Sequence, residues 1–336
     1  MSLCKSLKHK WLTGYGTLFA MLLLAISLNV AAEEGDSAKQ VEFGIFLTNL
    51  YDINLNKNQF NIQFWAWFLH SYPDYEPTKR TELMNAKSWT TQNAFRDQQD
   101  DVIWDVVNYR ATMTQQWDVS FYPFDTQTLE ISLEDIEETT AGVKFVPDVE
   151  GSKIADNLIP DGWVLKKFDI HVAPNRYQTA FGDPSLKKDQ SSDFSRITVA
   201  LTIQRDGERL FATNFIGFFV ANILVLVTLS INSSRRAHNV VPLQPRVTLS
   251  SGSIFATIGS IYMLSKELPY TTEFTLADCL LTTTCLGIAL AILTSVATDV
   301  ISKIADKFPI YTFNKFILLA FCLAHIGFNG AYIVSM

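Results

Sequence analysis

Four long apolar stretches follow residue 208, and they constrain the fold of this 336-residue chain more than any other feature. They cover residues 211–231, 246–264, 275–296 and 309–334. Each is near the ~20 residues that an α-helix needs to cross the apolar core of a bilayer. The sequence therefore predicts an all-α module of four transmembrane helices over residues 209–336.

The first 32 residues have the order of a secretory signal peptide. Three lysines among the first ten residues precede an apolar core at residues 18–26, and Ala31 and Ala32 follow it. An uncleaved membrane anchor is the alternative, but this core is short for a membrane span. We predict a signal peptide over residues 1–32, with cleavage near Ala32.

Basic residues between the apolar stretches predict the orientation in the membrane. They occur in the loops after the first and third stretches, as Arg235, Arg236, His238, Arg246, Lys303 and Lys307. Cytoplasmic loops are enriched in Lys and Arg. Together with the signal peptide, this predicts a multi-pass protein of a bacterial inner membrane, with the N-terminal domain and the C-terminus on the periplasmic side.

Residues 33–208 alternate apolar and polar side chains between turn signals, which is the pattern of β-strands. The clearest runs are residues 43–47, 61–68, 128–133, 163–172 and 197–203. They predict an all-β, immunoglobulin-like sandwich outside the membrane. The segment carries 29 acidic and 16 basic side chains, a net charge of −13, which disfavours nucleic acid as a partner. It contains no cysteine, so its core must form without disulfides.

The sequence predicts neither an enzyme nor a bound cofactor, because no catalytic triad, phosphate-binding loop or zinc-ligand spacing stands out. Carboxylates that could bind a divalent cation occur in two groups, Asp97, Asp100 and Asp101 and then Glu134, Asp135, Glu137 and Glu138. Solvated loops explain both groups more simply, and we predict no metal site.

The second apolar stretch is unusual because it is rich in Ser, Thr and Gly. A lipid-facing helix does not need these hydroxyls, whereas a helix lining water does. A rotation of about 100° per residue aligns one stripe, made of Thr248, Gly252, Phe255, Gly259, Tyr262 and Lys266. Several copies around an axis would form rings of Phe255 and Tyr262, which can close a pore by dewetting. Small residues also favour helix packing, so this stretch alone leaves both explanations open.

Residues 115–129 resemble the signature loop of pentameric ligand-gated ion channels, the Cys-loop receptor superfamily. The matching run is Trp117-Asp118-Val119-Ser120-Phe121-Tyr122-Pro123-Phe124-Asp125-Thr126-Gln127. Gln115 and Leu129 stand where animal members carry cysteines, and prokaryotic members likewise lack this disulfide. Further matches follow in the order of the family, namely Asp161-Gly162-Trp163 with Phe168, residues 197–205, Val247-Thr248-Leu249 and Leu268-Pro269-Tyr270-Thr271-Thr272.

The resemblance implies a homopentamer whose second helices line a central pore and whose agonist binds between neighbouring outer domains. It places the gating interface at Tyr122, Pro123, Phe124, Asp125, Arg205 and Pro269. An unpaired charge at this poorly solvated boundary is costly, so we expect Asp125 to pair with Arg205. Arg209 is the alternative arginine before the first span. The implied partners are membrane lipid, permeant inorganic ions and a small-molecule or proton agonist.

The sequence does not identify the agonist or the sign of the permeant ion. The candidate ligand-binding aromatics are Trp65, Trp67, Trp89, Trp104, Tyr177, Phe181 and Phe194. They could form a cage for an amine, or they could pack a core. The acidic outer domain and Glu267 favour cations, whereas Gln244-Pro245-Arg246 at the expected inner mouth is similar to anion-conducting members.

Two other classes of protein are alternatives to the ligand-gated channel. A non-conducting membrane sensor would bind a ligand through its β-sandwich and signal to a partner protein, but the cytoplasmic loops are short. A membrane enzyme would need a catalytic constellation, and the spans lack clusters of His, Asp and Glu. The predicted function is therefore a ligand-gated ion channel.

Overall fold

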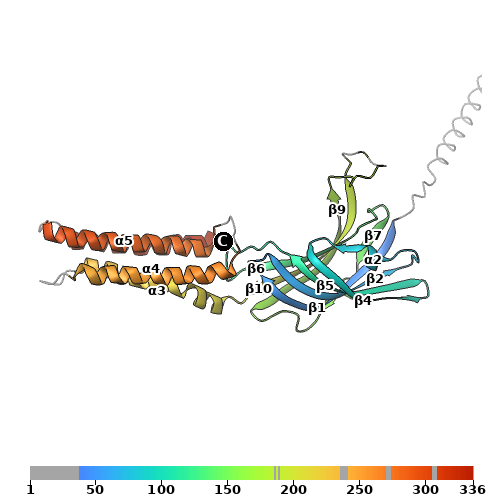
Figure 1. Cartoon of the computed structure of the whole chain (residues 1–336), viewed down its shortest axis with the longest axis horizontal. Coiled ribbons are helices and arrows are strands. Elements are labelled where there is room, and N and C mark those ends of the chain that lie inside the picture. Colours follow the sequence, from blue (N-terminus) through green and yellow to red (C-terminus); the bar gives the residue numbers. More distant parts are fainter. Residues whose placement is uncertain are drawn as a thin grey trace, which may run out of the picture.

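The computed structural model describes residues 38–184, 187, 190–234, 241–269, 274–304 and 309–335. A β-sandwich-like sheet domain is followed by four long helices, and the two parts lie end to end (Figure 1). This arrangement confirms the predicted order of an all-β part and an all-α part. Several predictions lie outside the described residues, namely the signal peptide of residues 1–32, Arg235, Arg236, His238, residues 270–272 and Lys307.

The sheet domain has two sheets. The larger sheet has the order β4-β5-β2-β1-β7, with β8 also paired to β1. Its strands are β1 (Lys39–Asn54), β2 (Gln59–His70), β4 (Ala86–Gln99), β5 (Val102–Thr114), β7 (Val143–Pro147) and β8 (Lys153–Ile154). The smaller sheet has the order β3-β6-β10-β9, from β3 (Thr81–Leu83), β6 (Thr126–Asp135), β9 (Trp163–Tyr177) and β10 (Ser192–Arg205). A short helix, α2 (Pro77–Arg80), precedes β3.

The alternation seen in the sequence creates the core between the two sheets. Along β2 every second side chain is buried, from Phe60 to Phe68, and β10 buries Ile197, Val199 and Leu201 in the same way. Successive side chains of a strand point to opposite faces, so each sheet turns one apolar face inward. These faces meet in one continuous cluster, which forms without any disulfide.

A buried charge cluster joins three strands of the larger sheet. Asp105 accepts hydrogen bonds from Arg96 and from the Nε2 atom of His70. The Tyr72 amide donates to Nδ1 of His70 at 3.2 Å, which holds the ring in place beside Asp105. Burial alone would raise the pKa of the Asp105 carboxyl, but the hydrogen bonds from His70 and Arg96 outweigh burial and hold it below its usual value.

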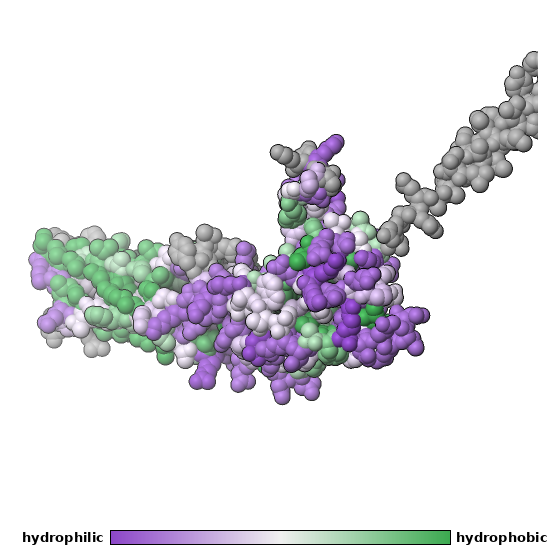
Figure 2. Space-filling view, turned by 45° about the vertical axis from the view of Figure 1, so that its right-hand side comes forward, coloured by the Kyte–Doolittle hydropathy of each residue, from purple (hydrophilic) through white to green (hydrophobic). Residues whose placement is uncertain are grey.

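The four helices are α3 (Glu208–Ser233), α4 (Leu243–Glu267), α5 (Leu276–Ile304) and α6 (Ile310–Ser335). All four contain segments that are long and apolar enough to cross a membrane. Figure 2 shows hydrophobic residues over the helices, whereas hydrophilic residues cover much of the sheet domain. α5 continues past the predicted end at residue 296, because Val300 and Ile301 prolong the apolar pattern and Asp299 finds partners in the bundle.

α4 packs against α3 and α5, whereas α6 packs against α3 and α5 on their other side. Gly217 permits the close approach of α3 and α4, because a Cβ atom there would overlap the carbonyl oxygen of Ala256. The end of α4 lies next to the sheet domain, where Asn56 of the β1–β2 turn donates to the Lys266 carbonyl at 3.2 Å. Among the residues that the structure describes, the other face of α4 has no neighbouring helix.

Candidate functional site

The loop of residues 115–125 forms the junction between the sheet domain and the helices. The Ser120 carbonyl accepts a hydrogen bond from the Leu276 amide at the start of α5, at 3.2 Å. Phe124 and Phe211 at the start of α3 have ring centroids 5.6 Å apart. A Cβ atom at Gly207 would overlap the carbonyl oxygen of Pro123, so the chain entering α3 passes directly against this loop. No sequence pattern singles out Gly207, because its role depends on the space around it in the folded chain.

The expected pair between Asp125 and Arg205 is present. Nε and Nη2 of Arg205 donate to the two carboxylate oxygens at 2.7 and 3.2 Å, and the two side chains are 9% and 2% exposed for Arg205 and Asp125. Gln127 also donates to Asp125, at 2.7 Å. The Arg205 guanidinium lies 4.1 Å from the ring centre of Trp163. Arg209 is exposed in the first turn of α3, so Arg205 is the arginine that pairs with this loop.

Tyr122 links the Arg205 pair to α3. Its ring faces the Arg205 guanidinium, 5.1 Å away, and its hydroxyl accepts a hydrogen bond from Nδ2 of Asn214 at 3.1 Å. Burial raises the pKa of the Tyr122 hydroxyl, although nearby Arg205 acts in the opposite direction, so the phenol is neutral. Sequence reasoning missed Asn214, and its only signal was an amide within an otherwise apolar stretch.

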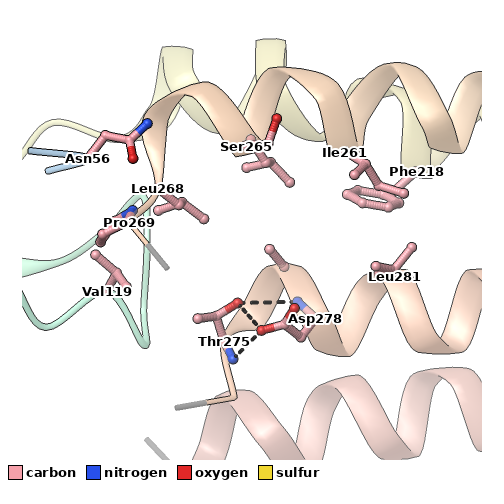
Figure 3. Close-up of a pocket in the computed structure, with 12 residues that line it drawn as sticks. Asn56, Val119, Phe218, Ile261, Ser265, Leu268, Pro269, Thr275, Asp278 and Leu281 are labelled. Atoms are coloured by element: carbon pink, nitrogen blue, oxygen red, sulfur yellow. Dashed lines mark hydrogen bonds between the residues drawn. The ribbon is translucent and has the colours of Figure 1, made fainter. Parts of the chain in front are cut away.

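A cavity of about 430 Å³ lies beneath the end of α4 (Figure 3). Val119 of the junction loop and Pro269, which follows α4, both line this cavity. The junction loop and the linker after α4 therefore meet here. Asp278 and Thr275 cap α5 reciprocally at its edge, because each side chain bonds the backbone amide of the other. Further lining residues are Asn56, Phe218, Ile261, Leu264, Ser265, Leu268, Ala277 and Leu281.

The stripe predicted on α4 lies on the face directed away from the bundle. Phe255 is 75% exposed and Tyr262 is 59% exposed in the single chain. Thr248, Gly259 and Lys266 are exposed as well, whereas Gly252 is partly buried. The opposite face of α4 is buried and consists of Arg246, Ser250, Ser253, Thr257, Ser260 and Leu264.

The hydroxyl-rich composition of α4 has two separate causes. Ser250, Ser253 and Thr257 lie in the packed face and donate to carbonyls one turn earlier. Helix packing, which the sequence left as an alternative, therefore explains this half of the hydroxyls. Among the other hydroxyls, Thr248 and Ser265 are exposed and Ser251 is partly buried, so the packed face and the outward face of α4 both carry hydroxyls.

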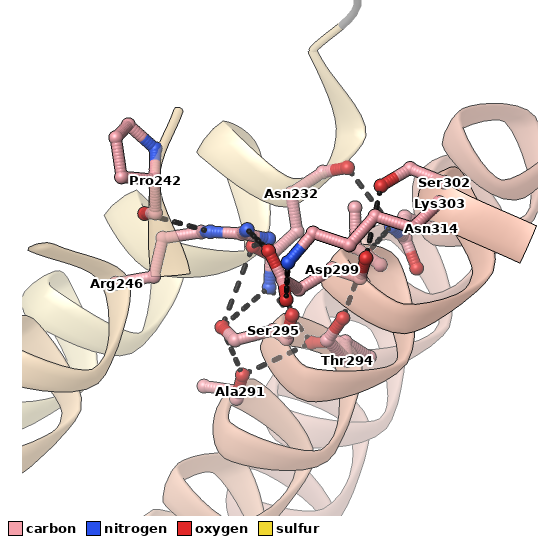
Figure 4. A network of polar contacts seen from close by, with 11 residues as sticks. Asn232, Pro242, Arg246, Ala291, Thr294, Ser295, Asp299, Ser302, Lys303 and Asn314 are labelled. Atoms are coloured by element: carbon pink, nitrogen blue, oxygen red, sulfur yellow. Dashed lines mark hydrogen bonds and ion pairs between the residues drawn. The ribbon is translucent and has the colours of Figure 1, made fainter. Parts of the chain in front are cut away.

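Arg246 is also placed differently from the prediction. It was expected in a cytoplasmic loop at the inner mouth, but its side chain is 1% exposed between the helices (Figure 4). Its Nη1 donates to the Asn232 side chain and to the Ser295 carbonyl, both at 3.2 Å, and Asp299 lies 3.9 Å from Nη2. Asn314 of α6 donates to the Asn232 carbonyl, so the network joins all four helices. Arg246 points away from the Phe255 stripe. Its charge therefore does not support the similarity to anion-conducting members that Gln244-Pro245-Arg246 suggested.

Three of the candidate ligand-binding aromatics form a cluster at the far end of the sheet domain. Tyr177, Phe181 and Phe194 have ring centroids 5.3 to 5.9 Å apart, in edge-to-face arrangements. They line a cavity of about 580 Å³. Among the described residues, its lining includes five carboxylates and no Lys or Arg, the acids being Glu82, Glu134, Asp135, Glu137 and Asp183.

The four candidate tryptophans belong to the larger sheet and do not line this cavity. Trp65 and Trp67 share the outer face of β2. Trp67 covers Gly44 and donates to Asp148 at 3.2 Å. Trp89 lies on β4, and Trp104 lies on β5. Within one chain the seven aromatics therefore do not form a single cage.

The prediction of a solvated loop is wrong for half of the second carboxylate group, whereas Glu137 is exposed in the loop after β6. Glu134 and Asp135 are buried at the end of β6. Glu134 pairs with Arg196 and accepts from Tyr177, whereas Asp135 accepts from Tyr75 at 2.7 Å. Within the described ranges, no group of three His, Cys, Asp or Glu side chains is arranged to hold a metal ion.

No protein-family model and no curated protein matches this chain. Its own fold and sites therefore define its class. It is a β-sandwich-like domain joined to four helices of membrane-spanning length, with a polar and aromatic junction between them.

Proposed function

We propose that this chain is one subunit of a homopentameric ligand-gated ion channel in a bacterial inner membrane, with an immunoglobulin-like outer domain. The sheet domain and the C-terminus would lie on the periplasmic side. The observation that carries this proposal is the open stripe of α4, which lies opposite its packed face and combines Thr248, Phe255, Tyr262 and Lys266. The resemblance of residues 115–129 to the Cys-loop receptor superfamily supports the same function.

The pore would form where the open stripes of several α4 helices face a common axis. Thr248 and Lys266 near the two ends of the stripe suit water better than lipid. Phe255 and Tyr262 are large and exposed, so repeated copies would place two aromatic rings across the conduit. Such rings can close a pore by excluding water. Glycines at 252 and 259 leave room between them.

The agonist site would be the acidic aromatic cavity around Tyr177, Phe181 and Phe194. Arg196 already pairs with Glu134 and lies over the Tyr177 ring, and Arg80 pairs with Glu137. Aromatic faces attract cations, so a small cationic amine would be held mainly by the rings of Phe181 and Phe194 and by the remaining carboxylates. A neighbouring copy would cover the open side of the cavity. Protons are the alternative agonist, since many carboxylates surround it.

Cations are the favoured permeant ions. The net charge of −13 on residues 33–208 concentrates cations at the outer mouth. Arg246 does not oppose them at the inner mouth, because its guanidinium is buried on the packed face of α4.

Cysteine accessibility tests the pore directly. In a background in which Cys279, Cys285 and Cys322 are replaced, a charged thiol reagent should modify Phe255→Cys, since apolar surroundings disfavour the reactive thiolate and water favours it. Ser253→Cys is the matched control on the buried face, and it should stay unmodified.

The same cysteine variants are then reconstituted in liposomes, and sodium flux is measured before and after modification. Modification of Phe255→Cys should change the flux. An unreactive Phe255→Cys, in protein that is modified at exposed Val149→Cys, would show that the stripe faces lipid and would refute the pore. A reactive but flux-free protein would instead fit a non-conducting sensor.

A further inference from the structure

We infer that Asn214 is the positioning residue through which α3 follows the movement of the junction loop. This inference rests on the proposed channel function, and it adds a residue that the resemblance did not supply. Asn214 lies in the second turn of α3, is buried, and donates from Nδ2 to the hydroxyl of Tyr122 at 3.1 Å. Tyr122 belongs to the loop, so one hydrogen bond joins side chains of the two domains.

Tyr122 connects Asn214 to the charged pair of the sheet domain. One end of the ring carries the hydroxyl bound by Asn214, and the ring itself faces the guanidinium of Arg205 at 5.1 Å. Arg205 is held by Asp125 through two hydrogen bonds. The tyrosine ring is rigid, so a displacement of Arg205 moves the hydroxyl as well. The order Asp125, Arg205, Tyr122 and Asn214 therefore forms a continuous physical link from β10 to α3.

Two other contacts at the junction are less suited to transmit the movement of the sheet domain to a helix. Phe124 and Phe211 meet through apolar rings, which can slide with little loss of contact. The hydrogen bond from Asn56 to the Lys266 carbonyl is exposed, so water can replace it. The Tyr122–Asn214 bond is buried, where water is not available and the geometry of a hydrogen bond matters most.

The burial of both partners also defines an informative double substitution. Removing one partner leaves the other without a hydrogen bond in a buried site, which destabilises the protein. Removing both, as Tyr122→Phe with Asn214→Leu, leaves two apolar side chains and restores stability. If the bond only stabilises the protein, the response of α3 should recover together with the melting temperature. If the bond positions α3, the melting temperature should recover and the response of α3 should not.

The experiment measures how α3 responds to a perturbation made in the sheet domain. Full-length protein in detergent micelles carries Asp125→Asn, which weakens the Arg205 pair. Hydrogen–deuterium exchange is then followed in residues 211–219 of α3. In the otherwise unmodified chain we expect exchange there to rise about five-fold, the factor that corresponds to one hydrogen bond. In the Tyr122→Phe/Asn214→Leu background we expect no rise.

The matched control uses a second asparagine of the same helix. Asn222 donates to Thr284 of α5 at 2.8 Å, within the bundle and away from the junction. In the Asn222→Leu/Thr284→Val background the five-fold rise should persist. If the double substitution at Tyr122 fails to fold, Tyr122→Phe alone takes its place, because it removes only the hydroxyl.

Two results would overturn the inference. One is a rise that persists in the Tyr122→Phe/Asn214→Leu background, and the other is no rise in any background. Neither result depends on ion flux, so either one would remove the role of Asn214 without testing the channel. The channel itself is tested separately on the same preparations, by the thiol modification and sodium flux of the Phe255→Cys protein.

Discussion

Replacing Asp125 with asparagine tests how strongly the junction depends on its buried ion pair. The substitution keeps the shape of the side chain and removes its charge. Arg205 would stay almost fully buried, at 9% exposure, without a counter-charge. The prediction is a large loss of stability in the sheet domain, together with a change in gating if the pair transmits movement.

The structure sets the size of the expected effect. Breaking a buried pair by removing one partner costs about 3–5 kcal/mol. The rings of Trp163 and Tyr122, 4.1 and 5.1 Å from the guanidinium, still stabilise the cation by about 1–2 kcal/mol. We therefore expect Asp125→Asn to lower the free energy of unfolding by about 1–4 kcal/mol. The double variant Asp125→Asn/Arg205→Met should recover most of the lost free energy of unfolding, because no isolated charge remains.

Urea unfolding of the full chain in micelles, followed by tryptophan fluorescence, measures this free energy. Every tryptophan after residue 32 lies in the sheet domain, so the signal reports that domain. The pair between Arg176 and Asp193 is the matched control, since it has the same two-bond geometry at 2.8 and 2.9 Å but is exposed. Asp193→Asn should leave the unfolding curve unchanged, as is usual for surface pairs.

A loss below about 1 kcal/mol for Asp125→Asn would refute this reasoning, because it would show that the pair behaves like a surface pair. Exchanging the two charges, as Asp125→Arg with Arg205→Asp, extends the test to gating. If the exchanged protein is made in normal amounts but its gating is not restored, the pair does not transmit the movement of the sheet domain. It would then only hold the two domains together.

Three further predictions concern other parts of the molecule. Gly207→Ala should lower the melting temperature by an amount equivalent to about 1–3 kcal/mol, because its methyl group would overlap the backbone of Pro123. The pKa of Asp105 is lowered by folding, so its contribution to stability is complete above pH 3.8 and is lost as the pH falls through the folded-state pKa. Urea unfolding at pH 7 and pH 3 should show this loss, and Asp105→Asn should reduce it. Phe255→Ala should pass ions from liposomes without ligand; if only Tyr262→Ala does so, the gate is the outer ring.

The sequence by itself determined the order of the two domains and the face of α4 that is open. Alternation of apolar side chains over residues 43–47 and 197–203 is a local property, and both runs are strands in the structure. The position of Phe255 on a stripe follows from helical geometry alone. The pair between Asp125 and Arg205 was expected because charges at a dry boundary need partners.

Only the tertiary structure decided which polar side chains are buried and by what. Ser253 and Thr248 look alike in sequence, yet Ser253 is buried and Thr248 is exposed. The sequence predicts that Arg246 lies in a loop. Its side chain is buried instead, because Asn232 and Ser295 supply hydrogen-bond acceptors from distant parts of the chain. Burial depends on residues that fold to the same place from far along the chain, and local spacing carries no record of those contacts.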